Sequence, residues 1–103
     1  MLAAGMKPIH WNAEKNHLLM RDRGISFEAI LLAVQMGGLL DDLVHPNPEK
    51  YPGQRMLVVD VDGYAWLVPY VETETEIFFK TIIPSRKATR EYLRGRQRED
   101  QTQ

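Results

Sequence analysis

The sequence predicts an α+β fold in which two N-terminal helices pack on an antiparallel sheet of three to four strands, and a basic C-terminal helix follows. Three observations lead to this fold. Capping residues precede two short apolar segments, segments rich in valine, isoleucine and aromatic residues lie in the middle, and seven basic residues fall within residues 80–98. With 103 residues, of which 44% are hydrophobic, we expect a single domain over 1–103.

The two helices are predicted from their capping residues. Asn12 is a favourable N-cap for a helix that ends near Arg23, because Gly24 can adopt the left-handed conformation common after a helix. Ser26 caps a second helix, which Gly37-Gly38 ends. Residues 1–8 are expected to form a flexible extension.

The strands are predicted from composition and turn signals. We expect them at Leu39–Val44, Arg55–Val61, Tyr64–Glu72 and Ile77–Ile83. Asp62-Gly63 is a strong two-residue hairpin signal, so the last three strands form an antiparallel meander. Pro69 then needs an edge or a bulge, because it has no backbone N–H.

The register of this meander predicts which residues lie opposite one another and which face the helices cover. Val59 is expected opposite Trp66, and Tyr70 opposite both Arg55 and Phe79. The helix-covered face is expected to carry Leu57, Val59, Val61, Trp66, Val68, Phe79 and Ile83.

Charge is distributed unevenly along the chain, although the net charge is only −1. Residues 25–79 contain nine acidic residues but only Lys50 and Arg55 as basic ones, whereas residues 80–98 contain seven basic residues and only Glu91 as an acid. A polyanionic partner is therefore expected to contact the C-terminal third.

The helix predicted from Arg86 to about Arg98 carries cations where a helix does not favour them. Arg86 and Lys87 lie in the first turn, near the positive end of the helix dipole, and each costs about 0.3–1 kcal/mol unless an anion is close. Lys87, Arg90, Arg94 and Arg98 follow at helical spacing along one face. This face is a candidate phosphate-binding site, and the alternative is an ordinary solvated surface. Residues 99–103 are expected to fray.

Lys80 and Arg55 are two further candidates. Lys80 interrupts an apolar strand, so it either protects a sheet edge or projects toward the basic helix, where it could pair with charge developing on a phosphate. Arg55 starts a strand and ranks lower as a phosphate contact, because such an arginine often only faces solvent.

Other chemistry has little support in the residues. There is no cysteine, and no two histidines have the spacing of helical metal ligands, so we expect neither a metal nor another cofactor. Asp41 and Asp42 are adjacent in a strand and should point to opposite faces, although a metal-dependent nuclease that uses both with His45 is a weaker alternative. No apolar run reaches the ~20 residues of a membrane span, so we expect a cytoplasmic protein.

Four short motifs stand out along the chain: Trp11-Asn12-Ala13-Glu14-Lys15-Asn16, Arg23-Gly24-Ile25-Ser26-Phe27-Glu28, Asp41-Asp42 before a His-Pro loop, and Arg86-Lys87-Ala88-Thr89-Arg90-Glu91 after the last strand. Together they resemble the BrnT family of toxins from bacterial type II toxin–antitoxin systems. The last motif is the most specific, and the resemblance spans roughly residues 9–93.

The resemblance implies a RelE-like ribonuclease fold and a small DNA-binding antitoxin as partner, in a higher-order complex. It also implies RNA cleavage without a metal, with the neighbouring 2′-hydroxyl as nucleophile. In such a toxin, Arg86 and Lys87 would stabilise charge on the phosphate, Lys80 would assist, and Arg90, Arg94 and Arg55 would bind RNA. No general base emerges from the residues, so the alternative is a non-catalytic module that binds a partner protein or nucleic acid.

Overall fold

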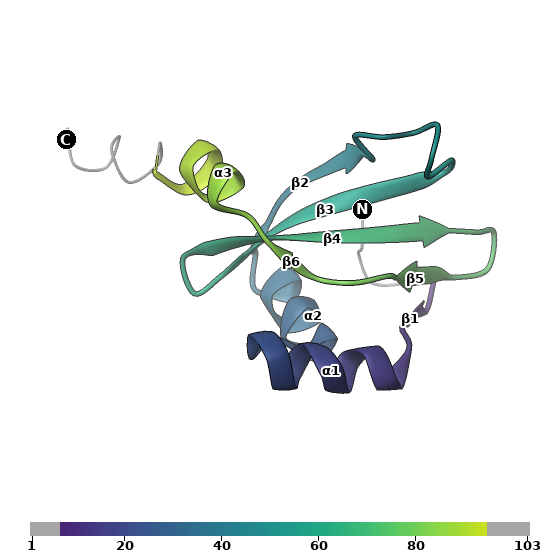
Figure 1. The fold of residues 1–103 in the computed structure, drawn as a ribbon, viewed down its shortest axis with the longest axis horizontal. Helices are drawn as coiled ribbons and strands as arrows, with labels where there is room; N and C mark the ends of the chain where they lie inside the picture. Colours follow the sequence, from purple (N-terminus) through teal and green to yellow (C-terminus); the bar gives the residue numbers. More distant parts are fainter. Residues whose placement is uncertain (1–6, 95–103) are drawn as a thin grey trace.

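A computed structural model describes residues 7–94, and its centre is a mixed sheet with the strand order β1-β5-β4-β3-β2 and with β6 paired to β4 (Figure 1). The strands are β1 (Ile9–His10), β2 (Leu39–Val44), β3 (Gln54–Val61), β4 (Tyr64–Glu72), β5 (Ile77–Phe79) and β6 (Ile83–Pro84). The helices are α1 (Ala13–Arg23), α2 (Phe27–Gln35), α3 (Arg86–Ala88) and the π-helical η1 (Thr89–Arg94), which continues α3. The predicted α+β class is confirmed.

The capping residues act as the sequence predicts. The side chain of Asn12 accepts a hydrogen bond from the backbone N–H of Lys15 at 2.8 Å, and Gly24 ends α1 with a φ of 68°. Ser26 accepts a hydrogen bond from the N–H of Ala29 at 3.1 Å and begins α2. Each cap satisfies a backbone donor that the helix itself leaves without a partner.

The meander forms in the predicted register. Val59 pairs with Trp66, and Tyr70 lies between Arg55 on one side and Phe79 on the other. Asp62 and Gly63 both have positive φ, 53° and 84°, as expected for a tight turn whose twist matches that of the strands.

The predicted sheet was too small and was wrong in being purely antiparallel. Ile9 and His10 form β1, which pairs in parallel with β5 and was predicted as part of no strand. Within the extension expected over residues 1–8, Lys7 and Pro8 are also held: Lys7 donates to Glu72 at 2.8 Å, and the carbonyl of Pro8 accepts from Ile77 N–H at 3.0 Å. Residues 1–6 lie outside the described part of the chain.

The strand predicted over Ile77–Ile83 is broken, and Pro69 explains the break. The carbonyl of Pro69 accepts a hydrogen bond from the N–H of Lys80 at 2.8 Å. The reciprocal bond to the carbonyl of Lys80 cannot form, because proline has no N–H. The backbone hydrogen bonding along this side of β4 therefore stops after β5. It resumes only at β6, which pairs with Trp66 and Leu67.

The break also changes which isoleucine enters the main core, which lies between the sheet and α1 and α2. Ile82 is fully buried there, whereas Ile83, which was expected on this face, is 38% exposed on β6. The core otherwise contains the predicted strand residues together with Leu19, Ile25, Phe27 and Ile30 from the helical region. We call this helix-covered side of the sheet the inner face.

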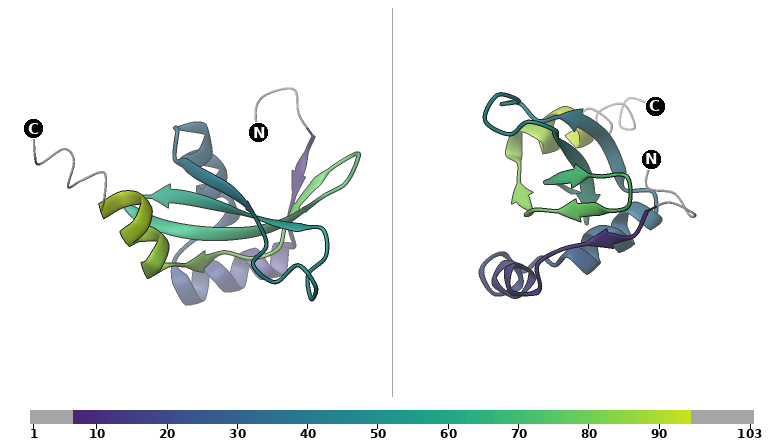
Figure 2. Two further views of the ribbon diagram at one scale, coloured as in Figure 1. Left: turned by 90° about the horizontal axis from the view of Figure 1, so that it is seen from above. Right: turned by 90° about the vertical axis from the view of Figure 1, so that its right-hand side faces the viewer.

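The opposite, outer face of the sheet is partly covered by α3 and η1, which together form the C-terminal helix (residues 86–94). Ala88 and Leu93 pack there against Val58 and Ala65 in a second, smaller core. Figure 2 shows the N-terminal helices and the C-terminal helix on opposite sides of the central strands. The predicted helix was expected to continue to about Arg98, and its last residues, like 99–103, lie outside residues 7–94.

Candidate phosphate-binding surface

Two side chains fix the start of the C-terminal helix. Ser85 is its N-cap and accepts a hydrogen bond from the N–H of Ala88 at 3.0 Å. Thr89 accepts a hydrogen bond from the N–H of Ala65 in β4 at 2.8 Å and donates one to the carbonyl of Ser85 at 2.8 Å. The N–H of Ser85 also donates to the carbonyl of Ala65 at 3.0 Å, so both residues attach the helix to the sheet.

A third anchor joins the far end of the helix to the edge strand β2. The hydroxyl of Tyr92 donates a 2.6 Å hydrogen bond to Oδ2 of Asp41. This bond, followed by one from the backbone N–H of Asp42, lowers the pKa of Asp41, and the same carboxylate raises the pKa of Tyr92 to about 12. At neutral pH, Asp41 is thus a stable acceptor and Tyr92 a stable donor.

Four of the cations predicted to bind phosphate lie on the solvent side of this anchored helix. The exposed residues are Arg86, Lys87, Arg90 and Arg94. Within residues 7–94, the four ion pairs that form involve none of them. Glu91 is the only acidic residue of the C-terminal helix, so the structure brings together four cations with one acid on one surface. Arg98 lies outside the described residues.

Lys80 is exposed but does not project toward the C-terminal helix, contrary to expectation. The backbone N–H of Lys80 bonds to Pro69 of β4, whereas the N–H of Ser85, at the start of the helix, bonds to Ala65. At ~3.3 Å per residue, Pro69 and Ala65 are about 13 Å apart along β4, and Lys80 is separated from the start of the helix by a similar distance. Its ammonium lies 5.7 Å from the ring centroid of Phe78, on the side of Lys80 away from the helix. Lys80 therefore lies apart from the cations of the helix, and its role in phosphate binding stays a prediction.

Phe78 is a candidate contact that the sequence analysis missed. Phe79 is fully buried in the main core, so its neighbours Phe78 and Lys80 alternate to the outer face, which also carries the C-terminal helix. Phe78 is half-buried, pairs across the strands with Val71, and lies beneath the Lys80 ammonium. A period-two alternation starting from Phe79 is the sequence signal that identifies it.

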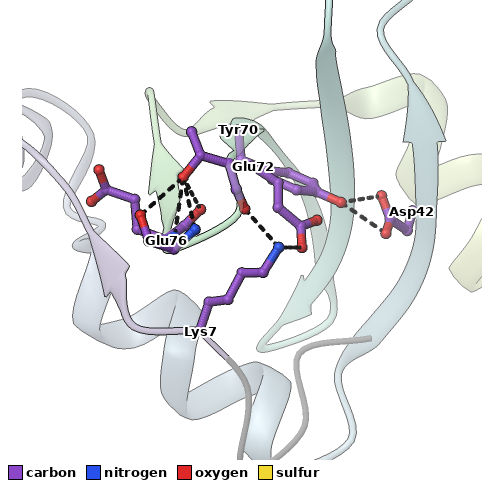
Figure 3. A network of polar contacts seen from close by, with 7 residues as sticks. Lys7, Asp42, Tyr70, Glu72 and Glu76 are labelled. Atoms are coloured by element: carbon purple, nitrogen blue, oxygen red, sulfur yellow. Dashed lines mark hydrogen bonds and ion pairs between the residues drawn. The ribbon is translucent and has the colours of Figure 1, made fainter.

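Arg55 lies on the inner face, away from the C-terminal helix. Its Nε donates to Oδ1 of Asp42 at 3.2 Å, and its Nη2 donates to the carbonyl of Asp42 at 3.0 Å. Tyr70 donates to both carboxylate oxygens of Asp42 at 2.8 and 2.9 Å, as Figure 3 shows. Burial, and then this carboxylate, raise the pKa of Tyr70 to about 12. The structure thus does not bring Arg55 together with the other candidate cations.

The candidate metal ligands are also separated. Asp41 bonds to Tyr92 on the outer face and Asp42 bonds to Tyr70 on the inner face, so the two carboxylates do not converge. The ring of His45 packs instead on Tyr51, with the centroids 4.4 Å apart. Among residues 7–94, no three potential ligands cluster to hold a metal ion.

Comparisons with protein-family models, curated proteins and solved structures give no match to this chain. None of the helices in the described part of the chain is both long enough and apolar enough to cross a bilayer.

Proposed function

We propose that this protein binds RNA on its outer face, with the C-terminal helix contacting the phosphates. The observation that carries the proposal is the set of four exposed cations on a helix fixed by Ser85, Thr89 and Tyr92. Arg86 and Lys87 are unfavourable in the first turn of an isolated helix, but an anion at that position reverses the sign of the interaction. A phosphate backbone provides such anions at regular spacing.

The outer face also offers a surface for bases. Phe78 presents a half-buried ring with a lysine ammonium over it, and base stacking on an exposed ring needs no particular base. Single-stranded RNA can place its phosphates along a basic helix and its bases on an adjacent apolar sheet face. This combination favours single-stranded RNA over a duplex, whose bases are stacked within the helix.

A binding measurement with a matched control tests this proposal. The variant Arg86→Ala with Lys87→Ala should weaken binding of a fluorescent single-stranded RNA by at least about tenfold at low salt, since each lost phosphate contact removes favourable counterion release. The control, Arg21→Ala with Lys50→Ala, removes two exposed cations elsewhere on the surface and should bind normally. Equal affinities for both variants would refute the assignment.

We further propose, from the resemblance to BrnT toxins, that binding leads to cleavage of the RNA and inhibition of translation. The 2′-hydroxyl would attack the adjacent phosphorus and lose its proton to water. The bond from phosphorus to the 5′-oxygen would break, and that oxygen would take a proton from water and leave as a 5′-hydroxyl, so that a 2′,3′-cyclic phosphate remains. Arg86 and Lys87 would stabilise the charge on the phosphate oxygens. A RelE-like toxin of this kind would act in the cytoplasm and be held inactive by a small DNA-binding antitoxin in a higher-order complex. Induced expression should then arrest growth, and the Arg86→Ala, Lys87→Ala variant at the same level should not.

One observation favours the second candidate, a binding module without catalysis. Asp41 and Tyr92, the bonded titratable pair against the C-terminal helix, have pKa values shifted away from neutrality and so are poorly suited to proton transfer at pH 7. Incubation of labelled RNA with excess protein and a chelator distinguishes the two candidates. Cleavage supports the toxin, and intact RNA at saturating binding supports the module.

A further inference from the structure

A groove lies on the inner side of the sheet, between the C-terminal end of α2 and the β3–β4 turn. It encloses about 430 Å³, within the range of binding sites for ligands. Its walls are mainly apolar and come from Leu32, Ala33, Met36 and Val61. Leu32 is 56% exposed and Met36 is 78% exposed, so the groove presents apolar surface that the described chain does not cover.

The rim of this groove is negatively charged. Asp62 lines it at the β3–β4 turn, Asp60 lines it with the backbone that contacts Gly38 and holds its carboxylate at the same turn on the Gly63 N–H, and the negative end of the α2 dipole points toward it, with no basic residue in the last turn of α2. Among the described residues, those that line the groove include no lysine, arginine or histidine. The groove is therefore complementary to a ligand that is apolar at its centre and cationic around it.

Backbone contacts hold the groove in shape. The N–H of Asp60 donates to the carbonyl of Gly38 at 2.8 Å, and Oδ1 of Asp60 accepts from the N–H of Gly63 at 2.8 Å. A Cβ atom at Gly38 would lie 2.7 Å from the Asp60 carbonyl oxygen and 2.8 Å from that of Ala33, so the two walls approach as closely as glycine allows. A preformed groove loses little entropy when it is filled.

We propose that this groove binds a cationic peptide segment of a partner protein, which inserts an apolar side chain between Leu32 and Met36. Lysine or arginine residues flanking that side chain would lie near Asp60 and Asp62. The flexible thioether of Met36 adapts to different apolar side chains, which suits a peptide anchor. The negative rim repels RNA, so this site is independent of the outer face and does not rest on the RNA-binding proposal.

A peptide titration tests this site. The probe is a synthetic helical peptide with leucines at i, i+3 and i+4 and lysines elsewhere, and the matched peptides replace either the leucines by serine or the lysines by glutamate. In the isotope-labelled full-length protein, the amides of Gly37, Gly38 and Gly63 should show saturable shifts with the first peptide. Affinity for both matched peptides should be at least about tenfold lower.

Matched variants test whether the acidic residues at the rim contribute to peptide binding. Asp60→Asn with Asp62→Asn keeps the turn, because asparagine accepts the Gly63 hydrogen bond and tolerates the positive φ at position 62. This variant should bind the probe peptide about tenfold more weakly. Glu49→Gln with Glu74→Gln removes two exposed charges elsewhere and should leave the affinity within about twofold.

Three outcomes would overturn the proposal. The first is the absence of saturable shifts up to about 1 mM peptide. The second is equal affinity in the two charge variants. The third is self-association of the free protein, seen by sedimentation and abolished by Met36→Lys, since a second copy of the chain would then be the occupant.

Discussion

Tyr92 and Asp41 lie 51 positions apart in the sequence, and the hydroxyl of one donates a 2.6 Å hydrogen bond to the carboxylate of the other. This bond ties the C-terminal helix to the edge strand β2 on the outer face, while Thr89 ties its start to β4. The cations of the helix are thus carried on a rigid support. An anchored cation loses less side-chain and backbone freedom on binding a phosphate than a mobile one.

Removal of the Tyr92 hydroxyl should loosen this support without disturbing the main core. We expect Tyr92→Phe to lower the urea midpoint slightly with an unchanged m-value, and to increase hydrogen exchange in residues 86–94 more than in β3 and β4. Normal exchange in the C-terminal helix of this variant would show that the hydrogen bond does not anchor it.

The pKa of Tyr92 predicts how stability changes at alkaline pH. A tyrosine in the unfolded chain titrates near pH 10, whereas the folded pKa of Tyr92 is about 12, so its contribution is fully present below about pH 10 and is lost as the pH rises toward about 12. Between these values the folded protein holds about one more proton at this site than the unfolded chain. Tyr92→Phe should therefore reduce the slope of stability against pH there, and an unchanged slope would contradict the assignment.

The pKa of Asp41 predicts a change of stability at acid pH with the opposite sign, since stability here rises with pH. Its folded pKa is lowered, so its contribution is present above the unfolded value of about 3.9 and disappears as the pH falls through the folded value. Asp41→Asn should make the acid unfolding curve shallower in this range. Equilibrium unfolding at a series of pH values measures this effect, and Glu74→Gln, at an exposed site in the turn after β4, tests whether any lost carboxylate acts alike.

Phe78 and Phe79 are neighbours with different roles, and substitution by alanine should separate them. Phe79→Ala removes a fully buried ring and should cost about 3–5 kcal/mol of unfolding free energy. Phe78→Ala should cost less than about 1 kcal/mol of unfolding free energy. It should lower the affinity for single-stranded RNA by about fivefold or more, since stacking on a ring is worth ~1–3 kcal/mol per base. Denaturation and RNA titration of both variants check this pair, and normal RNA affinity of Phe78→Ala would remove Phe78 from the interface.

Features specified by neighbouring residues could be predicted from the sequence. The caps Asn12 and Ser26 and the Asp62-Gly63 turn each act within a few residues, and the turn then determines the register of Val59 with Trp66. The helix carrying Arg86 and Lys87 could be placed for the same reason, because Ser85 caps it locally.

Features that depend on distant segments could not be predicted. The parallel pairing of Ile9 with Ile77 has no turn signal, and the Tyr92 bond to Asp41 joins two segments that no local pattern relates. An edge or a bulge at Pro69 was predicted, but the position at which the side-chain alternation resumes was not: the break at Lys80 buries Ile82 in place of Ile83. The position of the basic helix therefore followed from local residues, whereas the structure places Lys80 and Arg55 away from that helix, and the binding role of each cation stays a prediction.

Replacement of Gly38, in the turn between α2 and β2, by any larger residue should lower the stability of the fold. A methyl group there would meet backbone oxygens of Ala33 and Asp60 below 3 Å, and backbone cannot move away as a flexible side chain can. Gly38→Ala should cost about 1–3 kcal/mol by urea denaturation, the usual range for overpacking. Gln35→Ala, an exposed substitution at the C-terminal end of α2, should stay within about 0.5 kcal/mol, and equal stability of the two variants would show that the close approach does not exist.

The salt dependence of RNA binding tests the phosphate-binding helix most directly. The logarithm of the binding constant falls with the logarithm of salt concentration by about 0.7 for each phosphate contacted on a single strand. Arg86→Ala with Lys87→Ala should therefore reduce the magnitude of this slope by about 1.4, whereas Arg21→Ala with Lys50→Ala should leave it unchanged. A wild-type slope in the first variant, or a reduced slope in the second, would contradict the assignment of phosphate binding to the C-terminal helix.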